Sequence, residues 1–173
     1  MSKRKIIRIS AALLFLSLTL YYFYPEQKLP AGTPIDRLVV FKSKRQLLAY
    51  SGGQLIKIYK IALGKQPIGK KECKDDNKTP EGIYIINDKN PNSNFHKNLG
   101  ISYPKNEDIL NSKRKGKPAG GDVKIHGLHN MAGFIGKLHR WVDWTAGCIA
   151  VTNDEIDELY NAVKVGTKIE INP

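Results

Sequence analysis

The sequence predicts a mainly β domain of the α+β class with few helices, preceded by an N-terminal transmembrane or signal segment. Three observations predict this arrangement. Short, closely spaced apolar runs separated by turn residues follow residue 35, and only one stretch near the C-terminus carries strong helix signals. An apolar run at residues 9–24 directly follows a basic segment. With 173 residues, the chain has room for one ordinary domain and an appendage.

The N-terminal segment has the features of a membrane anchor. Four basic residues precede the apolar run: Lys3, Arg4, Lys5 and Arg8. The run has 24 − 9 + 1 = 16 residues, which corresponds to about 24 Å of helix against a hydrocarbon core of about 30 Å. Arg8 can reach one interface, and the tyrosines within residues 21–24 suit the other. Because no small-residue cleavage site follows, we expect residues 1–24 to be an uncleaved anchor, with a cleaved signal peptide as the alternative.

The segment after the anchor is predicted to be a linker. Residues 25–35 include three prolines and a glycine, a composition typical of a spacer between a membrane and a domain. Residues 36–173 then form the predicted domain, outside the cytoplasm if the anchor is oriented with its positive end inside.

The strand candidates of the domain are closely spaced. Gly52-Gly53 is a two-residue hairpin connection, which favours antiparallel pairing of the runs on either side of it. The predicted strands are residues 36–41, 46–50, 55–63, 82–87, 122–125 and 165–171, the last with Val165, Thr167, Ile169 and Ile171 on one face. The polar segments 64–78, 87–98 and 105–117 are predicted loops, with a short helix around residues 107–110 and with His96 and the basic run 113–117 in solvent.

One helix is well signalled. Thr152 and Glu155 form a capping-box pattern at its start. Four apolar residues follow at helical spacing on one face: Ile156, Leu159, Tyr160 and Val163. The acidic residues of its first turn are interpreted as helix electrostatics, not as catalytic carboxylates.

The candidate catalytic residues gather in residues 123–153. This segment contains His126, His129 and His139 together with Cys148, which follows Gly147 and precedes the helix. A thiol needs a base to become a thiolate, and an attacked carbonyl needs donors for its developing negative charge. The combination therefore indicates nucleophilic acyl transfer.

Several motifs resemble those of one known family. Ile125-His126-Gly127, Gly147-Cys148 and the run 149–153 resemble the active-site signature of the L,D-transpeptidase catalytic domain (YkuD-type) family. Thr79-Pro80-Glu81-Gly82 resembles the family's entry to a strand, and residues 99–104 are similar to a further segment. The resemblance covers residues 36–173 and implies a β-sandwich or curved mixed sheet.

The resemblance also implies an activity, namely cysteine acyl transfer on peptidoglycan stem peptides. Cys148 would be the nucleophile, His126 the proton donor and acceptor, and the turn at Gly147 the oxyanion site. Thr145, His139 and Gly127 would contact substrate, and neither a metal nor another cofactor is implied. With water as the acceptor, the same acyl-enzyme gives an L,D-carboxypeptidase or amidase, and a non-catalytic wall-binding module is a further alternative.

Two departures from the family pattern affect the choice of base. Ala146 occupies the position where the family usually has a second histidine. The separation of His126 and Cys148 is 148 − 126 = 22 residues, which is longer than is common in the family, and residues 137–143 resemble an insertion. The base is therefore His126 or, from the insertion, His139.

Charge and cysteine content limit the other possibilities. The net charge of +12 favours an anionic partner, and the absence of a nucleic-acid-binding motif leaves cell-wall polymer or membrane ahead of nucleic acid. The three clustered histidines and Cys148 are residue types that zinc accepts, but their spacing fits no common zinc pattern. Cys73 lies in a charged loop and is interpreted as an incidental thiol, with redox gating through Cys148 as the alternative. No feature of the sequence predicts an oligomeric state.

Overall fold

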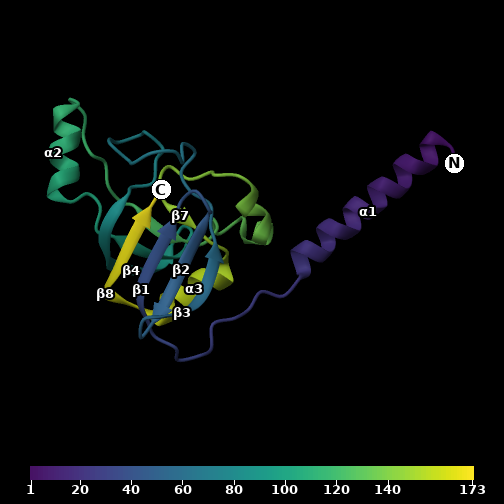
Figure 1. The fold of residues 1–173 in the computed structure, drawn as a ribbon, viewed down its shortest axis with the longest axis horizontal. Coiled ribbons are helices and arrows are strands. Elements are labelled where there is room, and N and C mark those ends of the chain that lie inside the picture. The colour runs from purple at the N-terminus through teal and green to yellow at the C-terminus, as the bar shows by residue number, and fades with distance from the viewer.

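The computed structural model describes residues 1–173 and shows a β-rich domain from which one long N-terminal helix extends (Figure 1). The helices are α1 (Lys3–Phe23), α2 (Asn106–Arg114), the 3-10 helix η1 (Gly133–Trp141) and α3 (Asn153–Ala162). The strands are β1 (Ile35–Phe41), β2 (Gln46–Ser51), β3 (Gln54–Lys60), β4 (Gly82–Ser93), β5 (His96–Ile101), β6 (Lys124–His126), β7 (Ile149–Ala150) and β8 (Val163–Asn172).

The strands form one curved mixed sheet in the order β3-β2-β1-β8-β4-β5-β6-β7. The pairs β1–β8 and β6–β7 are parallel, and the other neighbouring pairs are antiparallel. Beyond β3, Ala62 exchanges two backbone hydrogen bonds with Ala150 of β7, at 3.0 and 2.9 Å. The two ends of the sheet therefore meet, and the predicted curved mixed sheet with few helices is confirmed.

The core combines the inner faces of the strands with one face of α3. Ile156 and Leu159 are fully buried in the same apolar cluster as the strand residues, and Val163 lies in that cluster as well. The helix begins as predicted: the Glu155 N–H donates to Thr152 Oγ1 at 3.3 Å, and the Thr152 N–H donates to Glu155 Oε2 at 2.9 Å. The capping box fixes where the chain turns from β7 into α3.

The prediction of a loop at residues 87–98 is wrong. Strand β4 continues to Ser93, and β5 begins at His96, so that the two strands form a hairpin closed by the pair Ser93 and His96. Asparagine-rich strands carry no apolar alternation, because backbone pairing stabilises them while many of their side chains face solvent. His96 is consequently not a free loop residue, and its Nε2 lies 2.9 Å from Asp157 Oδ1.

Two further boundaries and the exposure of one residue differ from the prediction. α2 extends to Arg114, so the first part of the basic run 113–117 is helical and not loop. Strand β6 begins at Lys124, two residues later than predicted. In β8, Thr167, Ile169 and Ile171 are buried as predicted, but Val165 is exposed; it lies where the register of β1 and β8 shifts, between the pairs Ile35–Val163 and Arg37–Lys168.

The N-terminal helix and the linker differ in their contacts with the domain. α1 has no buried residue, and by length and composition it is able to cross a membrane, a test that a signal sequence also passes. The linker is attached to the domain: Leu29 packs against the core, and its N–H donates to Glu158 Oε1 at 3.2 Å. The predicted spacer is therefore a docked segment, since its side chains have partners on α3 and η1.

Candidate active site

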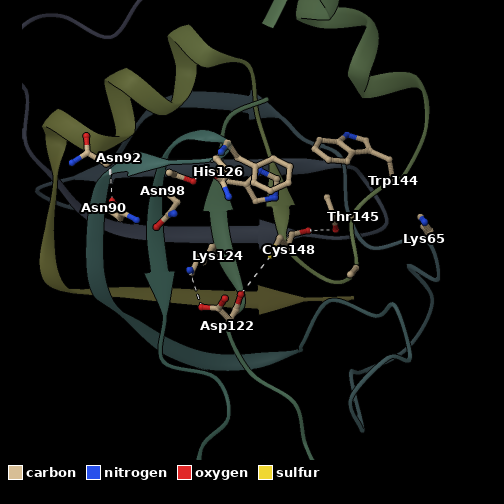
Figure 2. A pocket seen from close by; sticks show the side chains of 14 residues that line it. Lys65, Asn90, Asn92, Asn98, Asp122, Lys124, His126, Trp144, Thr145 and Cys148 are labelled. Atoms are coloured by element: carbon tan, nitrogen blue, oxygen red, sulfur yellow. Dashed lines mark hydrogen bonds and ion pairs between the residues drawn. The ribbon is translucent and has the colours of Figure 1, made fainter. Parts of the chain in front are cut away.

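The parallel pair β6–β7 positions the two main candidate residues. Ile125 pairs with Ile149, and His126 pairs with Ala150. Cys148 lies two residues before Ala150, so its side chain points to the same face of the sheet as that of Ala150. Side chains of alternate residues share one face of a sheet. His126 and Cys148 accordingly line one cleft of about 530 Å³ (Figure 2).

The turn before Cys148 is held by Thr145. The Thr145 hydroxyl donates to the Cys148 carbonyl oxygen at 2.7 Å and accepts from the Gly147 N–H at 3.1 Å. Gly147 has φ +132°, and a Cβ there would lie 2.6 Å from the Lys78 carbonyl oxygen, so only glycine fits. The Gly147 N–H is therefore engaged within the turn. The Cys148 N–H has no partner among the turn and loop hydrogen bonds, which makes it the better-placed donor for an oxyanion.

The Cys148 thiol lies in an environment that favours its neutral form. Burial raises its pKa, and the Asp122 carboxylate adds to this effect. The Lys124 N–H and the charges of Lys124 and Lys71 oppose the shift without cancelling it. The thiol is 3.7 Å from the Asp122 carbonyl oxygen, its hydrogen-bond acceptor in the structure.

The His126 imidazole is held as a neutral base. It is buried, and burial lowers its pKa, with a further contribution from the charge of Lys124. Its Nδ1 lies 2.7 Å from the Gly127 carbonyl oxygen, an acceptor that requires the proton to be on Nδ1. Nε2 is then left as the proton acceptor. The ring packs against both Phe95 and Trp144, whose ring centroids lie 4.6 and 5.6 Å away and 6.1 Å from each other.

The other predicted site residues occupy different positions. Thr145 lines the cleft, although both hydrogen-bonding directions of its hydroxyl are used by the turn. Gly127 does not line the cleft; a Cβ there would lie 2.8 Å from Asn153 Oδ1, and its carbonyl orients His126. Both residues therefore act on the shape of the site and on its two reactive side chains.

The other histidines of the predicted site do not line the cleft that contains Cys148. His139 is buried in η1 outside the cleft, and neither of its ring nitrogens has a hydrogen-bond partner. His129 packs edge-on against Phe95 at 5.5 Å and accepts from the Met131 N–H. The structure contains no group of three or more His, Cys, Asp or Glu side chains able to hold a metal ion, so these histidines and Cys148 do not converge as zinc ligands.

The cleft also contains residues that the sequence did not reveal. Asn98 pairs directly with His126 across β5 and β6, and its Oδ1 is buried without a partner. The Trp144 Nε1 is likewise buried and unpaired. Figure 2 shows both side chains beside His126, with Lys124 and Asp122 at the opposite end. The signal for Asn98 is its register against His126, which is invisible until residues 96–101 are recognised as a strand.

Residues 35–171 match the model of the L,D-transpeptidase catalytic domain (YkuD). The chain belongs to this family. The resemblance found in the motifs is thereby confirmed.

Similar proteins agree with this assignment. YqjB of Bacillus subtilis (strain 168), named as a candidate L,D-transpeptidase, is 30% identical over 150 residues, covering 84% of this chain and 74% of YqjB. YafK of Escherichia coli (strain K12), named in the same way, is 30% identical over 138 residues, covering 76% of this chain and 48% of YafK. The crystal structure of Pgp2, a helical cell shape determining protein of Campylobacter jejuni, has the same fold, with a TM-score of 0.59 and 24% identity over 81% of this chain and 48% of that one. The chain thus spans about half the length of YafK and of Pgp2.

Proposed function

We propose that this protein is a peptidoglycan L,D-transpeptidase that acts by cysteine acyl transfer on stem peptides, with Cys148 as the nucleophile and His126 as the base. The observation that carries the proposal is a single cleft lined by both side chains, in which His126 is neutral and presents Nε2 as an acceptor. Membership of the family supports the reaction class and a location in the cell envelope.

The first half-reaction forms a thioester. The Cys148 thiol gives its proton to His126 Nε2, and the resulting thiolate attacks the carbonyl carbon at the L-centre of the diamino acid in stem position three. The negative charge on the carbonyl oxygen is stabilised by the Cys148 N–H at the turn. The carbon–nitrogen bond to D-alanine then breaks, and the leaving amine takes the proton from His126.

The second half-reaction releases the acyl group. An amine of a second stem peptide or of a protein gives a proton to His126 and attacks the thioester, so that an amide forms and the Cys148 thiol is restored. Water in place of the amine would give a free carboxylate, which is the L,D-carboxypeptidase or amidase outcome.

The walls of the cleft suit a peptide with carboxylates. Lys65 and Lys124 line it and supply positive charge; Lys124 is paired with Asp122 at 2.8 Å, so Lys65 is the lysine of the cleft without a carboxylate partner. The Asn98 Oδ1 and Trp144 Nε1 atoms are buried in its wall without partners, and a shift of these side chains on binding would offer one acceptor and one donor to backbone groups of the peptide. Such groups gain most from a partner because they are already desolvated.

The nucleophile is tested by substitution of each cysteine. The Cys148→Ala variant should lose all detectable cross-linking and D-alanine release from purified disaccharide tetrapeptide, because no other group in the cleft is a comparable nucleophile. The matched Cys73→Ser variant should keep activity, since Cys73 does not line the cleft. Mass spectrometry of the products distinguishes cross-linked dimers from hydrolysed tripeptide. Turnover by Cys148→Ala would contradict the enzyme mechanism.

The fold should survive the loss of this thiol, because Cys148 occupies a turn held by Thr145 and Gly147. A carbapenem adduct on the wild-type chain, absent from Cys148→Ala of unchanged circular dichroism, would separate a catalytic thiol from a non-catalytic wall-binding module.

We further propose that α1 anchors the enzyme in the membrane, with the domain on its outer side. The apolar helix supports this topology, as does the basic segment at its N-terminal end. Peptidoglycan stem peptides are then the substrate and the bilayer a second partner.

A further inference from the structure

The segment around η1 exposes its apolar side chains and buries its charged ones. Phe134 and Trp141 are 77% and 58% exposed, whereas the Lys137 and Arg140 side chains are only 13% and 5% exposed. Four large apolar side chains form this surface, which we call the η1 patch: Met131, Phe134, Trp141 and Val142. A segment that faces only water would be expected to expose its charged side chains and bury its apolar ones.

The segment η1 lies beside the C-terminal end of α1, on the side of the domain from which this helix leaves (Figure 1). The Tyr22 hydroxyl donates to the Phe134 carbonyl oxygen at 2.5 Å. The rings of Tyr21 and Trp141 have centroids 5.8 Å apart. The exposed aromatic side chains of η1 are thus continuous with the tyrosines at the end of the helix.

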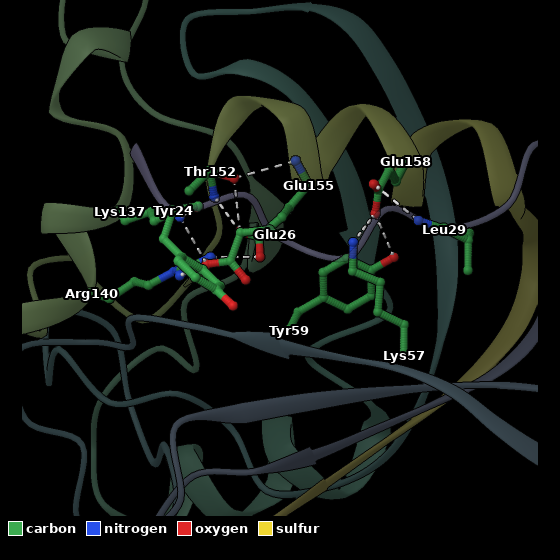
Figure 3. Close-up of polar contacts among 10 residues, drawn as sticks. All are labelled: Tyr24, Glu26, Leu29, Lys57, Tyr59, Lys137, Arg140, Thr152, Glu155 and Glu158. Carbon is green, nitrogen blue, oxygen red and sulfur yellow. Dashed lines mark hydrogen bonds and ion pairs between the residues drawn. The ribbon is translucent and has the colours of Figure 1, made fainter. Parts of the chain in front are cut away.

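Ion pairs attach η1 to the chain that leaves α1 (Figure 3). Arg140 bridges Glu26 of the linker and Glu155 of α3, at 2.8 and 2.7 Å. Lys137 contacts the Tyr24 carbonyl oxygen and Glu26. Burial alone would raise the pKa of Glu26, but Arg140 and Lys137 outweigh it, so the pKa is lowered and the carboxylate is charged. The distance between the η1 patch and the helix end is therefore fixed by the linker.

We propose that the η1 patch docks into the outer interface of the bilayer that α1 spans; this inference rests on the proposed anchoring of α1. Tyrosine and tryptophan favour the headgroup level of a membrane, where an aromatic ring is buried while its polar atom stays wet. Tyr21, Tyr22 and Trp141 would occupy this level together. Because α1 already holds the domain at the surface, docking is intramolecular and needs little additional apolar area.

A lipid surface fits the η1 patch better than a protein partner does. The patch adjoins the end of a helix whose own exposed aromatic residues, Phe23 and Tyr24, leave the hydrocarbon at that point. A protein covering the patch would compete with headgroups for the same position.

Docking would also orient the cleft. Val142 of the η1 patch precedes Cys148 by 148 − 142 = 6 residues, and Trp144 of the cleft lies between them. The enzyme would then act on stem peptides close to the membrane, in one fixed orientation.

The two tryptophans allow a direct test, because the chain has only Trp141 and Trp144. In the full-length Trp144→Phe variant, Trp141 is the only tryptophan left. In phospholipid vesicles with brominated acyl chains, its fluorescence should be quenched, and more strongly by bromines near the headgroups than by bromines near the chain ends. In the matched Trp141→Phe variant, Trp144 lies in the cleft and should stay unquenched.

A second variant tests the apolar contact itself. Replacing both Met131 and Phe134 with Glu should reduce the quenching of Trp141 severalfold while the alkylation rate of Cys148 is unchanged, since neither residue lines the cleft.

The insertion of α1 is measured separately by its resistance to carbonate extraction. Inserted protein with unquenched Trp141 would overturn the docking and leave the anchor standing, and cross-links between η1 patches of two copies would also overturn it in favour of a dimer. Extraction of the chain by carbonate would overturn the anchor and, with it, the docking.

Discussion

At the scale of single residues, the two reactive groups have opposite pKa shifts with one physical origin. Burial disfavours the charged form of each, so it lowers the pKa of His126 and raises that of Cys148. The resting site therefore holds a neutral imidazole beside a neutral thiol. A neutral thiol is less readily oxidised than a thiolate.

The lowered pKa of His126 should appear in the pH dependence of the reaction, and the raised pKa of Cys148 in that of its alkylation. An imidazolium cannot accept a proton, so kcat/KM should rise with pH through a midpoint below about 6.5, the ordinary value for histidine. In a Cys73→Ser background, alkylation of Cys148 by iodoacetamide should have its midpoint above about 8.5. Stopped assays at a series of pH values from about 5 to 10, which cover both titrations, measure the rate profile and the alkylation profile.

The same measurements identify the base. His126→Ala should abolish the acidic limb of the rate profile and reduce turnover on the order of 10² to 10⁴-fold, whereas His139→Ala should leave the acidic limb in place because His139 lies outside the cleft. If His139→Ala alone changed the alkylation profile of Cys148, the assignment of His126 would be wrong.

His139 should instead affect stability. Burial, with the charges of Arg140 and His126, lowers the pKa of His139 to about 4. In the unfolded chain its pKa is about 6.5, so between these values only the unfolded state binds the proton. The free energy of unfolding is therefore unaffected by the protonation of His139 above about pH 6.5, and it falls by roughly 3 kcal/mol as the pH decreases towards 4.

Denaturation by urea at several pH values checks this contribution. His139→Leu, which keeps an apolar side chain of similar size, should show a flatter decline between about pH 6.5 and 4 than the wild type. Because His126 titrates in both proteins, the difference between the two curves belongs to His139. Parallel curves would contradict the prediction.

The sequence brought the proposed nucleophile and base to one site, but it did not predict what surrounds them. Cys148 and His126 were recognisable from local motifs, and each lies in the cleft. Asn98 and Phe95 were hidden because their positions depend on the pairing of β4 with β5, a contact between two asparagine-rich segments without apolar alternation. His139 was an open alternative because the path of an insertion depends on tertiary contacts, here those of Arg140 with Glu26 and Glu155.

At the scale of elements, local signals succeeded where one short motif decides the structure. The Gly52-Gly53 hairpin and the capping box of α3 were both predicted from adjacent residues, and both are present. The linker was not predicted in its docked form, because its proline content indicates stiffness and says nothing about ion pairs formed with residues more than one hundred positions away.

The capping box offers a test at this scale. Thr152→Ala should lower the free energy of unfolding by about 1 kcal/mol, because the Glu155 N–H at the helix start loses its acceptor. Thr152→Ser keeps the hydroxyl and should retain most of the stability. Urea denaturation at neutral pH measures both variants, and equal losses for Ala and Ser would mean that the methyl group, not the cap, carries the effect.

At the scale of the whole molecule, the linker limits where the enzyme can act. Ten extended residues would reach at most about 35 Å. The contacts of Glu26 with η1 and of Leu29 with α3 remove most of this freedom, since they hold the first half of the segment against the domain. With α1 in the bilayer, as proposed, the cleft should therefore remain close to the membrane, within reach of newly made wall and not of distant layers.

The last prediction follows from this topology. Fractionation of native cells should recover the protein in the membrane with its N-terminal segment intact, because the Tyr-Tyr-Phe-Tyr-Pro sequence after the apolar run offers no small-residue cleavage site. N-terminal sequencing checks the cleavage, and a high-salt wash separates an anchored protein from one held only by its +12 charge, since salt screens the latter attraction. Recovery of a soluble species beginning after residue 24 would identify a cleaved signal peptide. The limit on reach would then disappear, and the ion pairs of Glu26 with Arg140 and Lys137 would serve only to fix the N-terminus of a freely diffusing enzyme.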